Sequence, residues 1–326
     1  MMTPRIDTHV HCRDWNQSYK ATIKQVTELA RKNGIMAFID MPNTEPPIFS
    51  IKEVDSRIGR ADSEGCLNGY YLNVGLTKDV KQIREAAIVT INPRVVGLKY
   101  FTSGKKTDAL AITNERDQYK VYETLTRCNY TGNITPHCEK ESLFNLGRFN
   151  PKEPWTWNDE RPPVSEEEAV KDQIRFAMET GFKGHIHIPH VSYSRTIDAI
   201  EKAAKEISIS GEVTPHHLLY STDDMRGETG LDKKTNPPIR SIEDVNLLWH
   251  KLKEISSKNQ VLFTIGTDHA PHTLKEKRSY PYASGHQSLL IYQQLLDELR
   301  NHGFSEAEID NLTYWNAKKI FTKIKE

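Results

Sequence analysis

Short apolar runs recur along the chain, and longer stretches with a helical spacing of apolar residues separate several of them. Eight runs predict β-strands, at residues 5–11, 35–41, 69–76, 94–101, 133–139, 184–191, 209–217 and 261–269. Four stretches between them have the 3.6-residue period of an amphipathic helix, at residues 19–34, 164–181, 194–206 and 241–255. We expect Ser165 to cap the second of these helices at its start and Gly181 to end it.

Strands that alternate with helices predict a parallel sheet, and eight of them predict a (β/α)8 TIM barrel. A doubly wound open sheet is the structural alternative, but no GxGxxG motif follows the first strand, so a dinucleotide-binding fold lacks support. The length of 326 residues fits one large barrel, and we expect a single domain over residues 1–326. The Pro- and Trp-rich stretch 146–163 is expected to be a loop between the fifth and sixth strands.

Composition and charge narrow the class of protein. Lys and Arg number 44, and Asp and Glu also number 44, which argues against a protein that binds nucleic acid or a membrane surface. No apolar run approaches the roughly 18 residues that a membrane span needs, and the first residues lack the apolar region of a signal peptide. The four cysteines show no CxxC pairing. We therefore expect a cytoplasmic protein.

Many of the 13 histidines lie near the ends of the expected strands. His9 and His11 lie two residues apart in RIDTHVHCRDW, so both project to one side of a strand, into the barrel if Thr8 and Val10 face the helices. The carboxyl ends of the strands carry the active site of a barrel, and two imidazoles at this spacing can bind one metal ion. Core histidines with satisfied hydrogen bonds are the alternative.

Lys99 is unusual because it lies in the apolar run RVVGLKYF, where an unpaired ammonium group is costly. It either extends to the surface, forms a Schiff base, or reacts with CO2 to give a carboxylate that can bridge two metal ions. His137, His190 and Asp268 lie near the ends of three later strand runs. A carboxylate such as Asp268 can bind a metal ion and transfer protons, with a helix cap or turn as the alternative.

This set of side chains resembles the metal site of the amidohydrolase superfamily. The members are, in chain order, His9, His11, Lys99, His137, His190 and Asp268. The resemblance implies two Zn2+ ions per subunit, bridged by carboxylated Lys99 and a hydroxide. His9, His11 and Asp268 would bind one ion, and His137 and His190 the other. Mononuclear relatives such as the nucleobase deaminases lack the bridging lysine, so Lys99 counts against that branch.

One ligand on the sixth strand is ambiguous from spacing alone. Strict alternation places His187 and His190 on opposite faces of the strand. The HVS-type ending of the family favours His190 as the ligand, so His187 lies either behind the ligands or outside the barrel. The roles of His187 and His286 stay open.

Further motifs narrow the resemblance. Arg13 follows the histidine pair, and its guanidinium suits a carboxylate, with a surface salt bridge to Asp14 as the alternative. Together with MPNT at 41–44, KTNPPIR at 234–240 and TDHAPHT at 267–273, HxHxR resembles the dihydroorotase family. That resemblance implies that Arg13 and Asn43 hold a substrate carboxylate, and that Asn236 and His272 complete the pocket.

The implied reaction is the reversible cyclisation of N-carbamoyl-L-aspartate to (S)-dihydroorotate in pyrimidine (UMP) biosynthesis, with Asp268 as the catalytic proton carrier. Hydantoinases (dihydropyrimidinases) and allantoinases share the metal ligands but typically lack the arginine, so Arg13 discriminates between the reactions. A third alternative is an inactive barrel that serves as a scaffold for a carbamoyltransferase. Such relatives lose metal ligands, whereas all six positions are filled here.

The resemblance also bears on partners and on domain content. It leaves room for a homodimer and for association with aspartate carbamoyltransferase, and it implies a small-molecule substrate. The first expected strand begins at residue 5, whereas many relatives carry a small β-domain built from both termini. We therefore expect an amidohydrolase-like barrel that lacks this β-domain.

Overall fold

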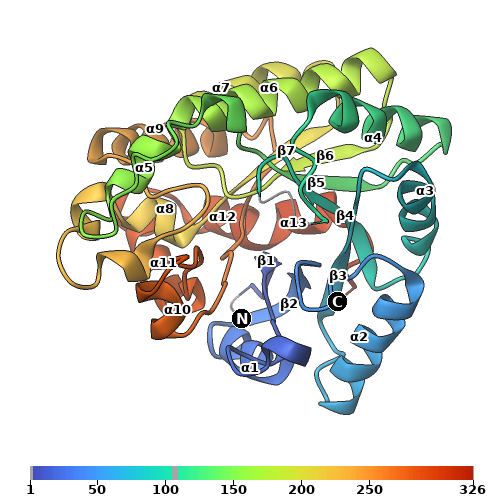
Figure 1. The fold of residues 1–326 in the computed structure, drawn as a ribbon, viewed down its shortest axis with the longest axis horizontal. Coiled ribbons are helices and arrows are strands. Elements are labelled where there is room, and N and C mark those ends of the chain that lie inside the picture. Colours follow the sequence, from blue (N-terminus) through green and yellow to red (C-terminus); the bar gives the residue numbers. More distant parts are fainter. Residues whose placement is uncertain (1–2, 105–108, 326) are drawn as a thin grey trace.

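The computed structural model describes residues 3–104 and 109–325 and shows a parallel barrel surrounded by helices (Figure 1). Eight strands follow one another around the sheet in chain order. They are β1 (Arg5–Val10), β2 (Ile35–Asp40), β3 (Tyr70–Gly75), β4 (Val95–Phe101), β5 (Asn133–His137), β6 (His185–Ile188), β7 (Ile209–Val213) and β8 (Phe263–Ile265). A parallel bridge between Val10 and His269 joins the two edges of the sheet. The predicted (β/α)8 barrel is confirmed.

Helices connect the strands and form the outer layer (Figure 1). The longer helices are α1 (Ile23–Lys32), α2 (Ile51–Ser63), α3 (Val80–Val89), α4 (Glu115–Arg127), α6 (Pro163–Thr180), α7 (Ser194–Ala203), α9 (Ile242–Lys258) and α11 (Tyr292–Asn301). The short ones are α5 (Thr156–Glu160), α8 (Pro215–Leu219), α10 (Leu274–Arg278), α12 (Glu306–Asp310) and α13 (Asn316–Ile320). Single turns are η1 (Trp15–Gln17), η2 (Glu141–Leu143), η3 (Thr222–Met225), η4 (Gly230–Lys233), η5 (Ser288–Ile291) and the π-helical η6 (Asn311–Trp315).

The start of α6 differs from the prediction. Pro162 is the N-cap and Pro163 the first residue, so Ser165 lies inside the first turn and does not cap the helix. Proline suits this position because its missing N–H has no partner within the helix. At the other end, Gly181 adopts the left-handed conformation with φ 69°, as predicted.

The core has one layer on each side of the sheet. The larger layer lies between the sheet and the helices, and Val10, Phe38 and Tyr70 belong to it. The smaller layer lies inside the barrel, where Ile6, Ile39 and Val96 meet residues of the C-terminal segment that includes η6 and α13. These C-terminal residues are Tyr314, Ala317, Ile320, Phe321 and Ile324.

The C-terminal segment covers the amino-terminal end of the barrel. Asn133, at the start of β5, donates a hydrogen bond to the carbonyl of Ile320 (3.1 Å). Asn316 donates to the carbonyl of Phe263, at the start of β8 (2.8 Å). In Figure 1, α12 and α13 are seen behind the ring of strands. The opposite, carboxyl end is where barrels carry their chemistry.

A buried ion pair ties α2 to the barrel. Arg57 donates from Nε (3.0 Å) and Nη2 (2.7 Å) to Asp40 Oδ2, and Tyr70 donates to the same oxygen (2.7 Å). The other oxygen of Asp40 accepts the backbone N–H of Cys12 (2.9 Å). The side chains of Asp40 and Arg57 are both fully buried. The pair therefore also fixes the turn that follows β1.

Replacing Asp40 with asparagine is expected to lower the free energy of unfolding by about 3–5 kcal/mol, because it leaves a buried guanidinium without its carboxylate. Urea unfolding followed by circular dichroism measures the change. Asp55→Asn on the exposed face of the same helix is the matched control and is expected to shift stability by less than about 0.5 kcal/mol. Equal midpoints for the two variants would contradict this expectation.

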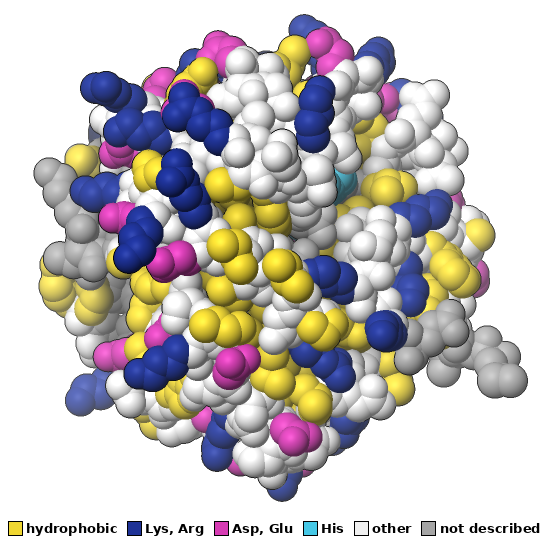
Figure 2. All heavy atoms as spheres, turned by 90° about the vertical axis from the view of Figure 1, so that its right-hand side faces the viewer, with side chains coloured by type: hydrophobic (Ala, Val, Ile, Leu, Met, Phe, Trp, Pro, Cys, Tyr) yellow, Lys and Arg dark blue, Asp and Glu magenta, His cyan; other side chains and the backbone are white. Residues whose placement is uncertain are grey.

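Positively and negatively charged side chains are mixed on the surface beside α2, α3 and α4 (Figure 2). Figure 2 shows Lys and Arg interspersed there with Asp and Glu, with hydrophobic side chains between them. Two such side chains near the end of α3, Ile88 and Ile91, are 65% and 80% exposed. Among the described residues, no helix combines the length and the apolar composition that a membrane span requires.

Candidate metal centre

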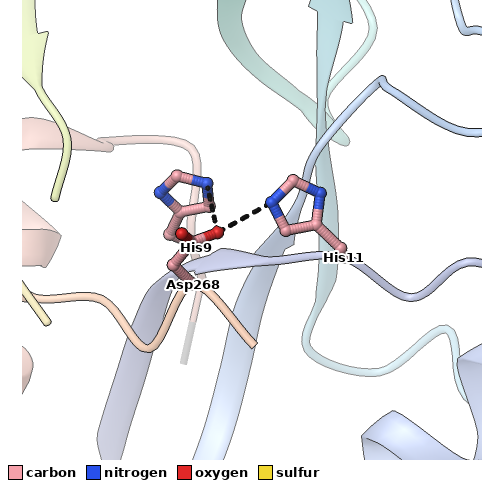
Figure 3. Close-up of side chains that lie close together, drawn as sticks. All are labelled: His9, His11 and Asp268. Atoms are coloured by element: carbon pink, nitrogen blue, oxygen red, sulfur yellow. Dashed lines mark hydrogen bonds and ion pairs between the residues drawn. The ribbon is translucent and has the colours of Figure 1, made fainter. Parts of the chain in front are cut away.

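Three candidate ligands from distant parts of the chain converge at the carboxyl end of the barrel (Figure 3). Asp268, which follows β8, places Oδ1 3.3 Å from His9 Nε2 and 2.8 Å from His11 Nε2. Within the part of the chain that the structure describes, they are the one group of three or more His, Cys, Asp or Glu whose ligand atoms lie within 4.8 Å of one another. Two imidazoles and a carboxylate at this spacing fit a transition-metal ion.

A bulge in β1 turns His9 into the barrel. Between Asp7 and Val10 the register with β2 shifts by one residue, so alternation breaks at this point. Thr8 and His9 both point inward, and Thr8 Oγ1 donates to Glu212 Oε2 (2.5 Å). The condition that Thr8 and Val10 both face the helices is therefore met by Val10 alone.

His137 and His190 form a second pair across the ends of β5 and β6. His137 Nδ1 lies 2.8 Å from His190 Nε2, and both rings are buried. The chain leaves β6 at Ile188, and His190 has a left-handed φ of 42°, which brings its ring back toward the barrel axis. His187 also lies inside the barrel, where its ring contacts Phe321 and its Nε2 lies 3.4 Å from Glu212 Oε2. Strict alternation therefore does not hold here, and of the two predicted positions His187 takes the one behind the ligands.

Lys99 lies in the barrel wall and does not reach the surface. Its side chain is fully buried, and its Nζ has no hydrogen-bond partner among the described residues. Burial lowers the pKa of Lys99 from 10.5 to about 8. A buried amine without a partner is costly, so its place fits a site that a further group completes.

Two buried carboxylates that the sequence reasoning did not single out lie behind the histidines. Glu212 Oε1 accepts a hydrogen bond from His9 Nδ1 (2.9 Å), and Glu139 Oε2 accepts one from His137 Nε2 (2.8 Å). Each bond leaves the other ring nitrogen facing the site. Burial raises the pKa of Glu139, but Arg161 and His137 outweigh it and lower the pKa to about 2. Both carboxylates had a signal in the sequence, since each is an acidic residue in an apolar strand or directly after one.

The stretch 146–163 lies between β5 and β6 as predicted, but it contains α5 and packs onto the site. Arg161 donates a bidentate pair of hydrogen bonds to Glu139, from Nε to Oε1 (2.9 Å) and from Nη2 to Oε2 (2.5 Å). Arg161 also donates to Ser103 (3.0 Å) and lies over the rings of Phe144 and Trp157. This segment is therefore part of the wall around His137.

Arg13 and His272 lie next to each other, beside the group of His9, His11 and Asp268. Arg13 Nη2 is 3.0 Å from His272 Nε2, and Arg13 Nε donates to the carbonyl of Pro271 (3.2 Å). The alternative, a salt bridge between Arg13 and Asp14, is not formed. The Asp14 carboxylate instead accepts from the backbone N–H groups of Trp15 and Ile23 and pairs with Arg60 (3.3 Å). Burial lowers the pKa of Arg13 to about 10.

The two predicted asparagines lie elsewhere on the rim. Asn43 is half-buried, and its Oδ1 has no partner among the described residues. Asn236 Oδ1 accepts a hydrogen bond from Trp157 Nε1 (3.1 Å). Within the described residues, no hydrogen bond joins either asparagine to Arg13 or His272. A substrate that contacts all four residues would have to extend from the asparagines to Arg13 and His272.

Two buried lysines tie together the loops at the mouth. Lys277 Nζ donates to the carbonyls of Lys234 (2.8 Å) and Gly285 (2.7 Å). Lys234 Nζ donates to the carbonyl of Tyr282 (3.0 Å) and lies 3.7 Å from the centre of a Trp157 ring. His286 directly follows Gly285. Its backbone carbonyl accepts a hydrogen bond from the N–H of Ala270 (2.8 Å), so His286 has a structural contact.

Lys277 predicts a pH dependence of stability. Burial lowers its pKa from 10.5 to about 7, so between these values the unfolded chain binds a proton that the folded chain does not. Stability relative to Lys277→Met is therefore expected to rise with pH, by roughly 3 kcal/mol between pH 6.5 and 9.5. Urea unfolding of both proteins at the two pH values measures the difference. A difference that stays constant or falls would contradict the expectation.

Comparison with known proteins adds to this geometry. No family model matches the chain. The curated dihydroorotase of Methanosphaera stadtmanae is 30% identical over 326 residues, covering 97% of this chain and 70% of that protein. Further curated dihydroorotases are 28% to 32% identical, and the chain spans 55% to 67% of their lengths.

Solved structures share the fold. An L-hydantoinase (dihydropyrimidinase) from Arthrobacter aurescens gives a TM-score of 0.83 at 21% identity, covering 98% of this chain and 71% of that one. A dihydroorotase from Saccharomyces cerevisiae, solved with 5-fluoroorotic acid, gives 0.75 at 20% identity, covering 98% and 84%. Both likenesses support the barrel.

Proposed function

The chain belongs to the dihydroorotase family, and from that premise we propose that it catalyses the reversible, metal-dependent cyclisation of N-carbamoyl-L-aspartate to (S)-dihydroorotate, a step of pyrimidine biosynthesis. The observation that carries the proposal is the pairing of Arg13 and His272 directly beside His9, His11 and Asp268. A cationic side chain next to a metal centre selects a cyclic amide that bears a carboxylate.

The donor set fits two metal ions. His9, His11 and Asp268 would hold one, and His137 and His190 the other. A Lys99 carboxylated at Nζ would bridge them, since its amine is buried and has no partner among the described residues. Zinc suits imidazole and carboxylate ligands. Bound metal ions would polarise the reacting carbonyl and activate water for attack on it.

The residues of the chain supply binding and proton transfer. Arg13, Asn43 and His272 would hold the substrate carboxylate, with Asn236 closing the rim, and so place the ring carbonyl beside the histidines. In ring opening, Asp268 takes the proton of the attacking water on its carboxylate and gives it to the departing ring nitrogen. In ring closure, Asp268 begins protonated, and the same transfer runs in reverse.

Metal content and substrate preference test the proposal together. We expect about two zinc ions per chain by elemental analysis, and turnover of dihydroorotate well above that of dihydrouracil, which has the ring but lacks the carboxylate. A preference for dihydrouracil would favour a hydantoinase, whose fold this chain shares. One metal ion or none, without hydrolysis of dihydroorotate, would support an inactive scaffold and overturn the proposal.

Two further properties belong to the proposal through the family resemblance. These are a homodimer and an association with aspartate carbamoyltransferase. The association would place the enzyme next to the source of its substrate, because carbamoyl transfer to aspartate produces N-carbamoyl-L-aspartate. Size-exclusion chromatography with light scattering, alone and with that enzyme added, tests both. A monomeric mass that the transferase does not change would contradict them.

A further inference from the structure

Glu212, on β7, is fully buried at the centre of the site and is surrounded by hydrogen-bond donors. Its Oε1 accepts from His9 Nδ1 (2.9 Å) and from the backbone N–H of His190 (3.2 Å). Its Oε2 accepts from Thr8 Oγ1 (2.5 Å), with His187 Nε2 at 3.4 Å. A carboxylate can only accept, so these contacts place the His9 proton on Nδ1.

The place of that proton decides what His9 can bind. With Nδ1 protonated, Nε2 carries the lone pair, and Nε2 is the nitrogen that lies 3.3 Å from Asp268 Oδ1 on the metal side. A hydrogen bond behind a metal-binding imidazole also fixes the orientation of the ring. Glu212 therefore selects the form of His9 that can bind a metal ion.

The contact with His190 extends the effect to the second pair. His190 has a φ of 42°, a backbone conformation that residues other than glycine rarely adopt. The bond from its backbone N–H to Glu212 holds the chain in this conformation. One carboxylate thus contacts a member of each histidine pair.

We propose that Glu212 is the positioning residue of the metal centre, setting the proton and orientation of His9 and fixing the turn that carries His190. The inference rests on the metal centre of the proposed function. Gly266 completes the arrangement, because a Cβ at this position would lie 2.2 Å from Cδ and Oε2 of Glu212. Only a glycine leaves the carboxylate room to sit where it does.

Two variants approach the carboxylate from different sides. Glu212→Gln replaces one accepting oxygen by an amide N–H2 that cannot accept from His9 or Thr8, and Gly266→Ala pushes the carboxylate away without changing any polar group. Thr8→Val is the matched control, because it removes one donor to Oε2 and leaves the bond to His9. Metal affinity is measured on metal-free, folded protein by competition of Zn2+ with a chromophoric chelator.

We expect Glu212→Gln and Gly266→Ala to weaken binding of the first Zn2+ by about 10- to 100-fold, and Thr8→Val by less than about threefold. Nitrogen NMR of the imidazoles in metal-free protein supplies a second readout, in which the Nδ1-protonated form of His9 is lost in Glu212→Gln. A purely structural role would lower the melting temperature of the metal-free protein and leave both readouts unchanged.

The outcomes separate this inference from the proposed function. Wild-type protein that binds zinc, with both variants binding it equally tightly, overturns the role of Glu212 alone. Wild-type protein that binds no zinc overturns the metal centre and this inference with it. If Glu212→Gln does not fold, Gly266→Ala decides by its zinc affinity.

Discussion

Replacing Lys99 with methionine will lower kcat/KM for dihydroorotate by at least about 1000-fold and reduce the zinc content below two ions per chain. Methionine has a similar length and keeps the barrel wall filled, so the change removes the amine and little else. Under the proposed function, this variant lacks the carboxylated amine that would bridge the two groups of ligands. Loss of metal assistance worth several kcal/mol corresponds to a factor of this size.

Lys78→Met, on an exposed site after β3, is the matched control for this experiment and is expected to retain both activity and zinc. Elemental analysis and steady-state hydrolysis measure the two effects on the same preparations. A Lys99→Met protein that keeps two zinc ions and full activity would show that the amine has no part in the centre.

Replacing Arg13 with alanine will lower kcat/KM for dihydroorotate by about 100- to 1000-fold and leave the zinc content unchanged. Charge-assisted hydrogen bonds to a carboxylate contribute about 1.5–3 kcal/mol, and loss of positioning at the metals adds to this. Arg13→Lys keeps the charge but not the planar fork, so only part of the activity is expected to return.

Substrate choice distinguishes this effect from general damage. Turnover of dihydrouracil, however weak, is expected to change less than about threefold in Arg13→Ala, because that ring has no carboxylate to lose. Arg148→Ala, on the exposed part of the stretch 146–163, serves as the control and is expected to behave as wild type. Equal losses on both rings would assign Arg13 to the structure of the β1 turn.

The fold could be predicted from the sequence because its signals are local and repeated. Each strand of the barrel is a short apolar run, and the helix around residues 164–181 has its apolar period and its closing Gly181 within one segment. The wrong cap at Ser165 arose because serine is a common N-cap, whereas the two prolines ahead of it had already fixed the start of the helix.

The site was harder to predict where the backbone departs from regular geometry. His9 points inward because of a bulge, and His190 because of a left-handed φ, and neither departure is visible in spacing. Arg13 and Asp268 also have positive φ, of 56° and 45°. Such conformations occur often at functional sites and are held by the surrounding structure.

Glu212 was missed for a different reason. The argument that singled out Lys99, a charge in an apolar strand, applies equally to ISGEV at 209–213. Its partners His9 and Thr8 lie more than 200 positions earlier in the chain, so only the closed barrel reveals what neutralises it. The sequence therefore marks both buried charges, and the structure shows which one has partners.

The closure of the ring also determines when the site can exist during synthesis. His11 and Asp268 are 257 residues apart, so a ribosome must synthesise the whole stretch between them before the group of His9, His11 and Asp268 can assemble. Until β8 emerges, β1 and the newest strand are open sheet edges with unpaired backbone groups, which favour aggregation. The first group of ligands can therefore bind a metal ion only after β8 has emerged and the ring has closed.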